Sequence, residues 1–316
     1  MSIGIALLGG FILLLGGGEV LVRGAARFSK TIGISPLMIG LTVVGFGTSM
    51  PELVTSIEAA IVGAPAIAVG NIIGSNLANS LLILGLAALA APLAVETAAL
   101  NRDCRVVMIA SALLLAAGFT TGLGRIAGSL FLLLLLGYVI FAYRQEKQAA
   151  NHAADIPMQP TERYSAAAVA MPLLPILLGM GGVIFGAQLL VQGAIALAEL
   201  AGLSHALIGL TIVAVGTSLP ELVTSIVAAI RKQGQLALGN VLGSNIFNIF
   251  GIGGVTGMVA PGPVPSEMAE VELPLLVVVT LLIVMFAISG REISRREGSV
   301  LVLAYLLYLA YAINRA

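Results

Sequence analysis

Long apolar stretches alternate with short polar or Gly/Pro-rich turns along the whole chain. Ten such stretches can be placed, at roughly 2–22, 36–62, 66–90, 106–122, 125–143, 168–198, 206–230, 236–259, 273–290 and 298–313. Most approach or exceed the about 20 residues that an α-helix needs to cross a bilayer. The pattern predicts an all-α polytopic membrane protein with ten transmembrane helices.

These helices divide into two sets of five at a polar segment. The first set occupies residues 1–143 and the second 168–316, while residues 144–167 carry charges of both signs. We predict that this segment is a short linker, too small to hold a soluble domain.

Part of the first half returns in the second half. Residues 33–85 align with 202–254 without a gap, and 29 of the 53 positions are identical. Because each half has an odd number of helices, the second copy is expected to cross the bilayer upside down. The sequence therefore predicts two inverted-topology five-helix repeats.

Each copy places a proline beside a glutamate within an apolar helix, in GTSMPELVTS and in GTSLPELVTS. Pro51 has no N–H and its ring clashes with the preceding turn, so helix 2 is expected to open near Gly47. The carbonyls from Gly45 to Thr48 would then lack helical partners, and helix 7 should break in the same way. An uncompensated carboxylate at membrane depth costs about 2.5–3.5 kcal/mol on insertion scales, so Glu52 and Glu221 are predicted to be functional.

The helix after each broken helix carries neutral polar side chains four residues apart. They are Asn71, Ser75 and Asn79 in the first copy and Asn240, Ser244 and Asn248 in the second. Carboxylate, hydroxyl and carbonyl oxygens are the ligands that hard cations prefer. These four helices contain no cysteine or histidine, which argues against a transition-metal site. The pattern favours a site for sodium or calcium.

Composition agrees with a membrane protein. Hydrophobic residues make up 59% of the 316 residues and charged residues 9%, against about 25% charged in soluble domains. The mean hydropathy is +1.09. The formal net charge is zero, so nothing in the composition indicates a nucleic-acid partner, and the single cysteine, Cys104, excludes an internal disulfide. The first apolar run ends at Arg23 without a convincing cleavage site, so we expect it to remain as the first membrane helix.

Basic residues predict the orientation, because short cytoplasmic loops retain Lys and Arg. With both termini outside, thirteen of the fifteen basic residues fall inside: Arg23, Arg27, Lys30, Arg102, Arg105, Arg144, Lys147, Arg163, Arg231, Lys232, Arg291, Arg295 and Arg296. The linker is then cytoplasmic, and we expect a multi-pass protein of the plasma (inner) membrane.

Two further glutamates receive lesser predictions. Glu58 aligns with Val227 and lies near the outer end of its helix, which is typical of an exposed vestibule residue. Glu19 lies one turn from Arg23, which favours a local ion pair.

Two pairs of segments closely resemble the two α-repeats of the sodium/calcium exchangers, within the cation/calcium exchanger superfamily. The first pair is GTSMPELVTSI with GNIIGSNLANSLLILG, and the second is GTSLPELVTSI with GNVLGSNIFNIFGIG. The resemblance extends over the ten-helix chain. It is closest to small microbial antiporters that lack the large regulatory domain of animal exchangers.

The resemblance implies that four helices hold cation sites at mid-membrane, with Glu52 and Glu221 binding both calcium and sodium. It further implies calcium ligation by the carbonyls of Thr48 and Thr217. Sodium ligands would be Ser49, Ser75, Ser218 and Ser244, with the carbonyls of Gly45 and Ala214 lining the outer and inner sodium sites. Asn79 also matches a family site position.

Asn248 departs from the archaeal pattern of the family, which has Asp at this position. Potassium-dependent relatives also have Asp here, whereas animal potassium-independent exchangers have Asn. The departure leaves proton coupling and potassium dependence open. Because the amide supplies a carbonyl oxygen without a third negative charge, we expect exchange that needs no potassium.

The sequence favours a secondary antiporter that exchanges sodium for calcium by alternating access, with net charge movement. We expect no cofactor and no enzymatic activity. We expect a monomer, with an oligomer as the alternative. Calcium/proton exchange is an alternative, because two glutamates can titrate. A passive cation channel is a second alternative, although inverted repeats with broken helices favour a transporter. A hydrolase would need a motif such as HExxH, which the sequence lacks.

Overall fold

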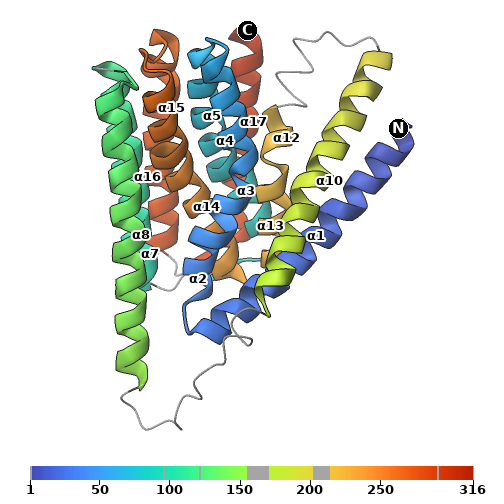
Figure 1. Cartoon of the computed structure of the whole chain (residues 1–316), viewed down its shortest axis with the longest axis vertical. Helices are drawn as coiled ribbons and strands as arrows, with labels where there is room; N and C mark the ends of the chain where they lie inside the picture. The colour runs from blue at the N-terminus through green and yellow to red at the C-terminus, as the bar shows by residue number, and fades with distance from the viewer. Residues whose placement is uncertain are drawn as a thin grey trace.

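The chain folds almost entirely into helices, as its apolar pattern predicts (Figure 1). The computed structural model describes residues 2–94, 97–120, 122–154, 171–201, 214–289 and 292–315. The expectation of an all-α protein is confirmed for this part of the chain.

The first half contains one small strand and a series of helical segments, two of which are π-helical (η). They are α1 (Ile3–Ile32), α2 (Pro36–Ile39), η1 (Gly40–Val44), α3 (Gly45–Thr48), α4 (Met50–Ile61), α5 (Pro65–Leu77), η2 (Ala78–Ile83), α6 (Leu84–Ala90), β1 (Leu93–Ala94), α7 (Thr97–Phe119) and α8 (Arg125–Ala154). α1 ends where Gly33 adopts φ 68°, a conformation that glycine takes without strain. α2 starts at once, because Ser35 caps it and Pro36 fits its first turn.

The second half has corresponding segments. They are α10 (Leu173–Leu200), α12 (Ala214–Thr217), α13 (Leu219–Ile230), α14 (Gly234–Ile246), η4 (Phe247–Ile252), α15 (Gly253–Val259), η5 (Met268–Glu272), α16 (Leu273–Ser289), β2 (Glu292–Ile293) and α17 (Arg295–Arg315). Many bounds recur at a spacing of 169 residues, as α13 does after α4 (219 minus 50). The same spacing relates the aligned sequences, so the repeated sequence gives a repeated local structure.

Seven helices among the described residues are long and apolar enough to cross a membrane, and the number rises to eight if the bent pair of Pro36–Thr48 and Met50–Ile61 counts as one span. Several helices are longer than the predicted ones, and α1 continues past residue 22 to Ile32. α7 begins at Thr97, ahead of the apolar run, and α8 continues past residue 143 to Ala154, so the start of the predicted linker is helical.

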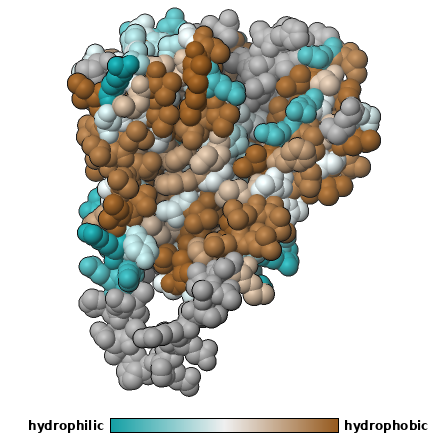
Figure 2. Space-filling view, viewed as in Figure 1, coloured by the Kyte–Doolittle hydropathy of each residue, from teal (hydrophilic) through white to brown (hydrophobic). Residues whose placement is uncertain are grey.

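The centre of the bundle holds the segments that follow the two broken helices. The most apolar window of α14 to α15 is 94% buried, and that of α5 to α6 is 78% buried, against 17% for α17. Apolar side chains cover much of the sides of the molecule in Figure 2. The exposed apolar side chains include Leu133 and Leu136 of α8 and Leu303 of α17. Such a surface suits contact with lipid rather than water.

α1 and α10 form a closely packed pair at one edge of the bundle (Figure 1). Gly10 lies against Gly186, and Gly17 lies against Gly179, so the two helices run antiparallel. A Cβ on Gly17 would be 2.6 Å from the backbone nitrogen of Val183, so only glycine permits this approach. Small residues at such crossings are typical of membrane helices, because they let two backbones pack directly.

One small sheet joins the two halves at the end of α6. β1 pairs with β2 in the antiparallel direction, with Leu93 opposite Ile293 and Ala94 opposite Glu292. A single bridge between Leu123 and Gly262 makes a similar contact between two other loops. These pairings connect loops of the first half to loops of the second half. The helices between these loops carry the candidate site.

Candidate functional site

The two broken helices place their breaks at one residue each. Ser49 separates α3 from α4 with φ −83° and ψ 9°, and Ser218 separates α12 from α13 with φ −92° and ψ 8°. The helix axes on the two sides of Ser49 differ by 43°. Proline two residues after each break supplies no N–H and so cannot continue the helical hydrogen bonds through it.

The expected opening near Gly47 is wrong in detail. The amide of Ser49 still donates to the carbonyl of Gly45, at 3.1 Å, so this carbonyl keeps a helical partner. The helix bends at Ser49 instead of unwinding from Gly45 to Thr48. The reason is that Pro51 removes only its own N–H, and the turn before it can keep its hydrogen bonds.

Both glutamates lie in the first turn after the break and are almost fully buried. Glu52 and Glu221 are each 1% exposed. Ser49 donates a hydrogen bond to Oε1 of Glu221 at 2.8 Å, and Ser218 donates to Oε1 of Glu52 at 3.3 Å. Each serine therefore serves the carboxylate of the other repeat, which brings the two carboxylates into one site. In the part of the chain that the structure describes, no ion pair with Lys or Arg involves either glutamate.

Several buried oxygens of this site have no hydrogen-bond partner within the described residues. They are Oε2 of Glu52, Oε2 of Glu221, Oδ1 of Asn79 and Oδ1 of Asn248. Asn79 lies in η2, which packs against α13, and Asn248 lies in η4, which packs against α4. A buried acceptor without a partner costs about 1–3 kcal/mol, and more when it is charged. A bound cation removes that cost, so these atoms are suited to cation binding.

The remaining predicted ligands belong to the segments before the two breaks and to the helices that follow them. Ser244 donates to the carbonyl of Gly45 at 3.2 Å, and Thr48 donates to the same carbonyl at 3.3 Å. Ser75 is buried on α5. Gly45 must be small here, because a Cβ would be 3.0 Å from the backbone nitrogen of Ser244. Thr217 ends α12, and Ala214 begins it.

Asn71 and Asn240 hold the glutamates in place from the neighbouring helices. The side-chain amide of Asn71 donates to the carbonyl of Glu52 at 3.1 Å and to Oγ of Ser56 at 2.9 Å. Asn240 repeats this pattern with the carbonyl of Glu221 at 3.3 Å and Ser225 at 2.9 Å. The polar stripes include these asparagines, but spacing alone did not reveal that their amides tie the helices together.

A cavity of about 470 Å³ leads to the site along α4 and α10. It reaches Thr217 and Pro220 at one end, and Glu58 lines it farther along α4. Gln188 and Gln192 of α10 form part of the facing wall. The expected vestibule position of Glu58 agrees with this cavity.

The sequence matches the sodium/calcium exchanger protein family over residues 2–144 and 171–314. These two stretches contain both broken helices and every residue of the site described above. The chain belongs to this family.

Similar exchangers and antiporters match nearly the whole chain. The putative antiporter CaxA of Alkalimonas amylolytica is 35% identical over 312 residues, which cover 95% of each chain. The sodium/calcium exchanger MaX1 of Methanosarcina acetivorans is 34% identical over 337 residues, which cover 96% of each. A solved structure of the sodium-calcium exchanger NCX_Mj superimposes with a TM-score of 0.86 at 33% identity, covering 98% of both chains. The resemblance stated from the α-repeats is confirmed.

In this exchanger a hard cation fits the donor set better than a transition metal. The site offers two carboxylates with hydroxyl, amide and backbone oxygens, the mixture that calcium and sodium prefer. The described residues contain no group of three or more His, Cys, Asp or Glu side chains that could hold a metal ion. Two carboxylates carry the charge needed to balance one divalent cation.

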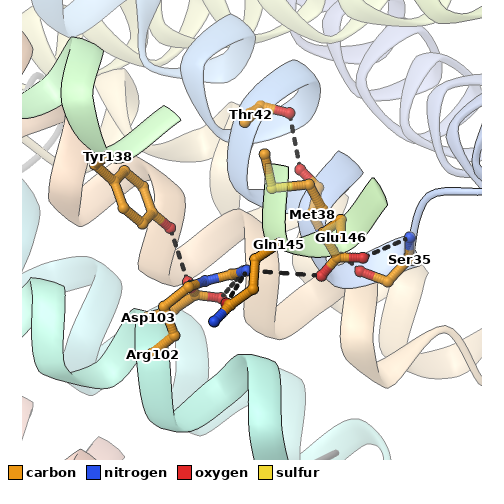
Figure 3. Close-up of polar contacts among 8 residues, drawn as sticks. All are labelled: Ser35, Met38, Thr42, Arg102, Asp103, Tyr138, Gln145 and Glu146. Carbon is orange, nitrogen blue, oxygen red and sulfur yellow. Dashed lines mark hydrogen bonds and ion pairs between the residues drawn. The ribbon is translucent and has the colours of Figure 1, made fainter. Parts of the chain in front are cut away.

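A second buried polar cluster of the exchanger lies away from the cation site (Figure 3). Arg102 pairs with the neighbouring Asp103 through two nitrogens, at 2.6 and 3.0 Å, and Tyr138 of α8 donates to Asp103 at 3.0 Å. Glu146 of α8 accepts the backbone N–H of Ser35 at 3.2 Å and lies 3.8 Å from Arg102. The cluster therefore connects the N-terminal end of α2 with both α7 and α8. Sequence reasoning used Arg102 only for orientation, although the adjacent opposite charge of Asp103 was a signal for pairing.

Proposed function

We propose that this protein is a secondary antiporter that exchanges sodium for calcium across the membrane by alternating access. The observation that carries the proposal is the crossed pairing of Ser49 with Glu221 and of Ser218 with Glu52. It joins a carboxylate from each repeat into a buried site whose free oxygens suit one calcium ion or several sodium ions. Neither ion needs a resident cofactor for binding here.

The proposed ligands are those expected from the sequence. Glu52 and Glu221 bind both ions, with the carbonyls of Thr48 and Thr217 on calcium. The proposed sodium ligands are Ser49, Ser75, Ser218, Ser244, Asn79 and Asn248, with the carbonyls of Gly45 and Ala214. This ligand set is supported by the burial of four of its members, Ser75, Asn79, Ser244 and Asn248. The hydrogen bonds of Ser244 and Thr48 to the Gly45 carbonyl support a close grouping of these donors.

We place ten membrane spans in the chain as two inverted five-helix repeats, 1–143 and 168–316, joined by the segment 144–167. Seven of these spans are the long apolar helices, and the bent pair is the eighth. We count α7 as the ninth span and α12 together with α13 as the tenth. The recurrence of helix bounds at a spacing of 169 residues supports the repeats. We propose that both termini lie outside and that the linker is cytoplasmic, because thirteen of the fifteen basic residues then lie inside. We further propose a monomer in the inner membrane.

In this orientation the cavity along α4 and α10 opens to the outside. Its lining runs from Pro220 at the break to Glu58 near the outer end of α4. The conformation is therefore outward-facing, and exchange requires a second conformation in which the inner side opens instead. We propose that α1 and α10 move together between these states, because their glycine contacts bind them to each other.

Calcium uptake into proteoliposomes under separately imposed sodium, proton and potassium gradients tests the function. Uptake driven by the sodium gradient alone is expected. Uptake driven by the proton gradient alone would instead identify a calcium/proton exchanger. Calcium flux without any opposing gradient, at rates that do not saturate with calcium, would identify a channel.

A further inference from the structure

Two neighbouring residues of α1, Gly18 and Glu19, make contacts near the C-terminal end of α13. Gly18 faces Val223 and Val227, since a Cβ built on Gly18 would lie 3.0 and 3.6 Å from their side chains. One turn after Val227, at the C-cap of α13, the guanidinium of Arg231 binds Glu19. Its Nη2 is 2.6 Å from Oε1, and its Nε donates to Oε2 at 2.8 Å. Glu19 also pairs with Arg23 as expected, but that residue is on the same helix.

The repeat spacing of 169 residues identifies the matching surfaces at the other end of the bundle. The mates of Gly18 and Glu19 are Ala187 and Gln188, and the mates of Val223 and Val227 are Val54 and Glu58. All four mates line the cavity. The same surfaces are therefore in contact at one end and apart at the other, as expected of a transporter caught in one of two related states.

The ion pair has no equivalent among these mates. Glu19 corresponds to Gln188, and Arg231 corresponds to Val62. Closing the outer cavity can bring Gln188 toward α4, but glutamine and valine cannot form an ion pair. The two closed ends are thus unequal in charge. Val223 has an apolar mate in Val54, whereas Val227 is matched by Glu58, so the outer end carries a carboxylate where the inner end is apolar.

We propose that Glu19 and Arg231 form an ionic latch that holds the inner end closed and favours the outward-facing state. The inference rests on the proposed function and orientation. Arg231 contacts Glu19 through two nitrogens, which fixes the geometry of the pair. The side chains are partly exposed, at 49% and 27%, so water and salt weaken the latch. A weak latch suits a carrier, because a strong one would stop exchange.

The test measures how often the inner end opens. Val223→Cys in a Cys104→Ala background places a single thiol at the contact with Gly18. A membrane-impermeant maleimide is added to the inner side in inside-out vesicles, so the labelling rate reports the population of the inward-facing state. Breaking the latch by Glu19→Gln or Arg231→Gln is expected to raise this rate by about two- to fivefold, and the double variant should rise no further than either single one.

Two matched controls separate the latch from a general loosening. Arg23→Gln removes a charge beside Glu19 without touching α13, and it should leave the labelling rate unchanged. Gln188→Glu combined with Val62→Arg builds a matching pair at the outer end, and it should raise the inner labelling rate in the otherwise native protein. Equal rates in Glu19→Gln and the parent, or additive effects in the double variant, would overturn the latch.

This readout needs no transport, so it is independent of the proposed ion specificity. A protein that moves no calcium but shows the labelling pattern would retain the latch and lose the proposed function. A protein that exchanges sodium for calcium with unchanged labelling would retain the function and lose the latch. Labelling that occurs in no variant would also overturn the latch, because no inner opening would exist for it to hold closed.

Discussion

Ser49 and Glu221 are 172 residues apart, yet the serine hydroxyl donates to the carboxylate at 2.8 Å. The mirrored contact from Ser218 to Glu52 is longer, at 3.3 Å. The break in each helix thus completes the carboxylate site of the other helix. Neither repeat holds a full set of these contacts by itself, which makes the site a property of the whole chain.

Replacing either glutamate by glutamine should abolish calcium exchange while the protein stays folded. Glu52→Gln and Glu221→Gln are nearly isosteric, but each removes half of the negative charge that balances a dehydrated calcium ion. Sodium-driven calcium uptake by purified protein measures the loss. The exposed Glu270→Gln is the control and should transport normally. Near-normal exchange by either site variant would contradict the assignment.

The two serine contacts should differ in strength. A hydrogen bond to a charged group contributes about 1.5–3 kcal/mol, and the shorter bond from Ser49 should contribute more. We expect Ser49→Ala to raise the apparent KM for calcium by about tenfold, and Ser218→Ala to raise it less. Ser111→Ala, which removes a buried hydroxyl next to Thr280 outside the site, serves as the control. Equal KM values in all three variants would argue against a role of the hydroxyls.

Asn248 should keep the exchange independent of potassium. The amide offers a carbonyl oxygen without a third negative charge, so the site has less reason to take an additional monovalent cation or a proton. Sodium-driven calcium flux is measured with and without potassium, from pH 6 to 8, in the native protein and in Asn248→Asp. The native protein should show the weaker pH dependence. Indistinguishable profiles would mean that the neutral charge of Asn248 does not set the ion requirement.

Exchange should carry net charge. Two carboxylates balance one calcium ion, whereas more than two sodium ions in the same site leave excess positive charge on the loaded carrier. A membrane potential supplies about 2.3 kcal/mol per charge per 100 mV and should therefore change the initial rate. Potentials imposed with potassium and valinomycin test this in both directions. Rates that ignore the potential would indicate an electroneutral stoichiometry.

The buried cluster of Figure 3 should matter for stability more than for ion affinity. Tyr138→Phe removes one hydrogen bond to Asp103 and should cost about 1.5–3 kcal/mol. Asp103→Asn removes the nearer of the two carboxylates that pair with the buried Arg102 and should cost about 3–5 kcal/mol. Thermal unfolding in detergent shows which of the two variants loses more stability. The KM for calcium, measured well below the unfolding temperature, should change little in Tyr138→Phe.

Residue patterns predicted much of this molecule because they act locally. Apolar length set the helices, and Pro51 and Pro220 located the breaks to within a few residues. The repeat also predicted that Glu52 and Glu221 would be equivalent. Their burial and their matching contacts to Asn71 and Asn240 agree with this.

The contacts that sequence reasoning missed join distant segments. The partner of Ser49 lies in another repeat, and Arg231 reaches Glu19 across 212 positions. Periodicity describes one helix at a time, so it cannot reveal which helix ends meet. The extension of α8 to Ala154 was missed for a different reason, because polar residues beyond 143 resembled a linker although they favour helix.

The position of α1 and α10 at the edge of the bundle has a consequence for the choice of reconstitution lipid. Their outer sides expose Ile5, Leu8 and Phe11 on α1 and Leu177, Leu178 and Phe185 on α10. Acyl chains therefore form much of the surface along which this pair would slide. Hydrocarbon thickness then acts directly on the moving part, at fractions of a kcal/mol per Å of mismatch. Turnover measured in short-chain and long-chain phosphatidylcholine should differ even where the cation site is the same.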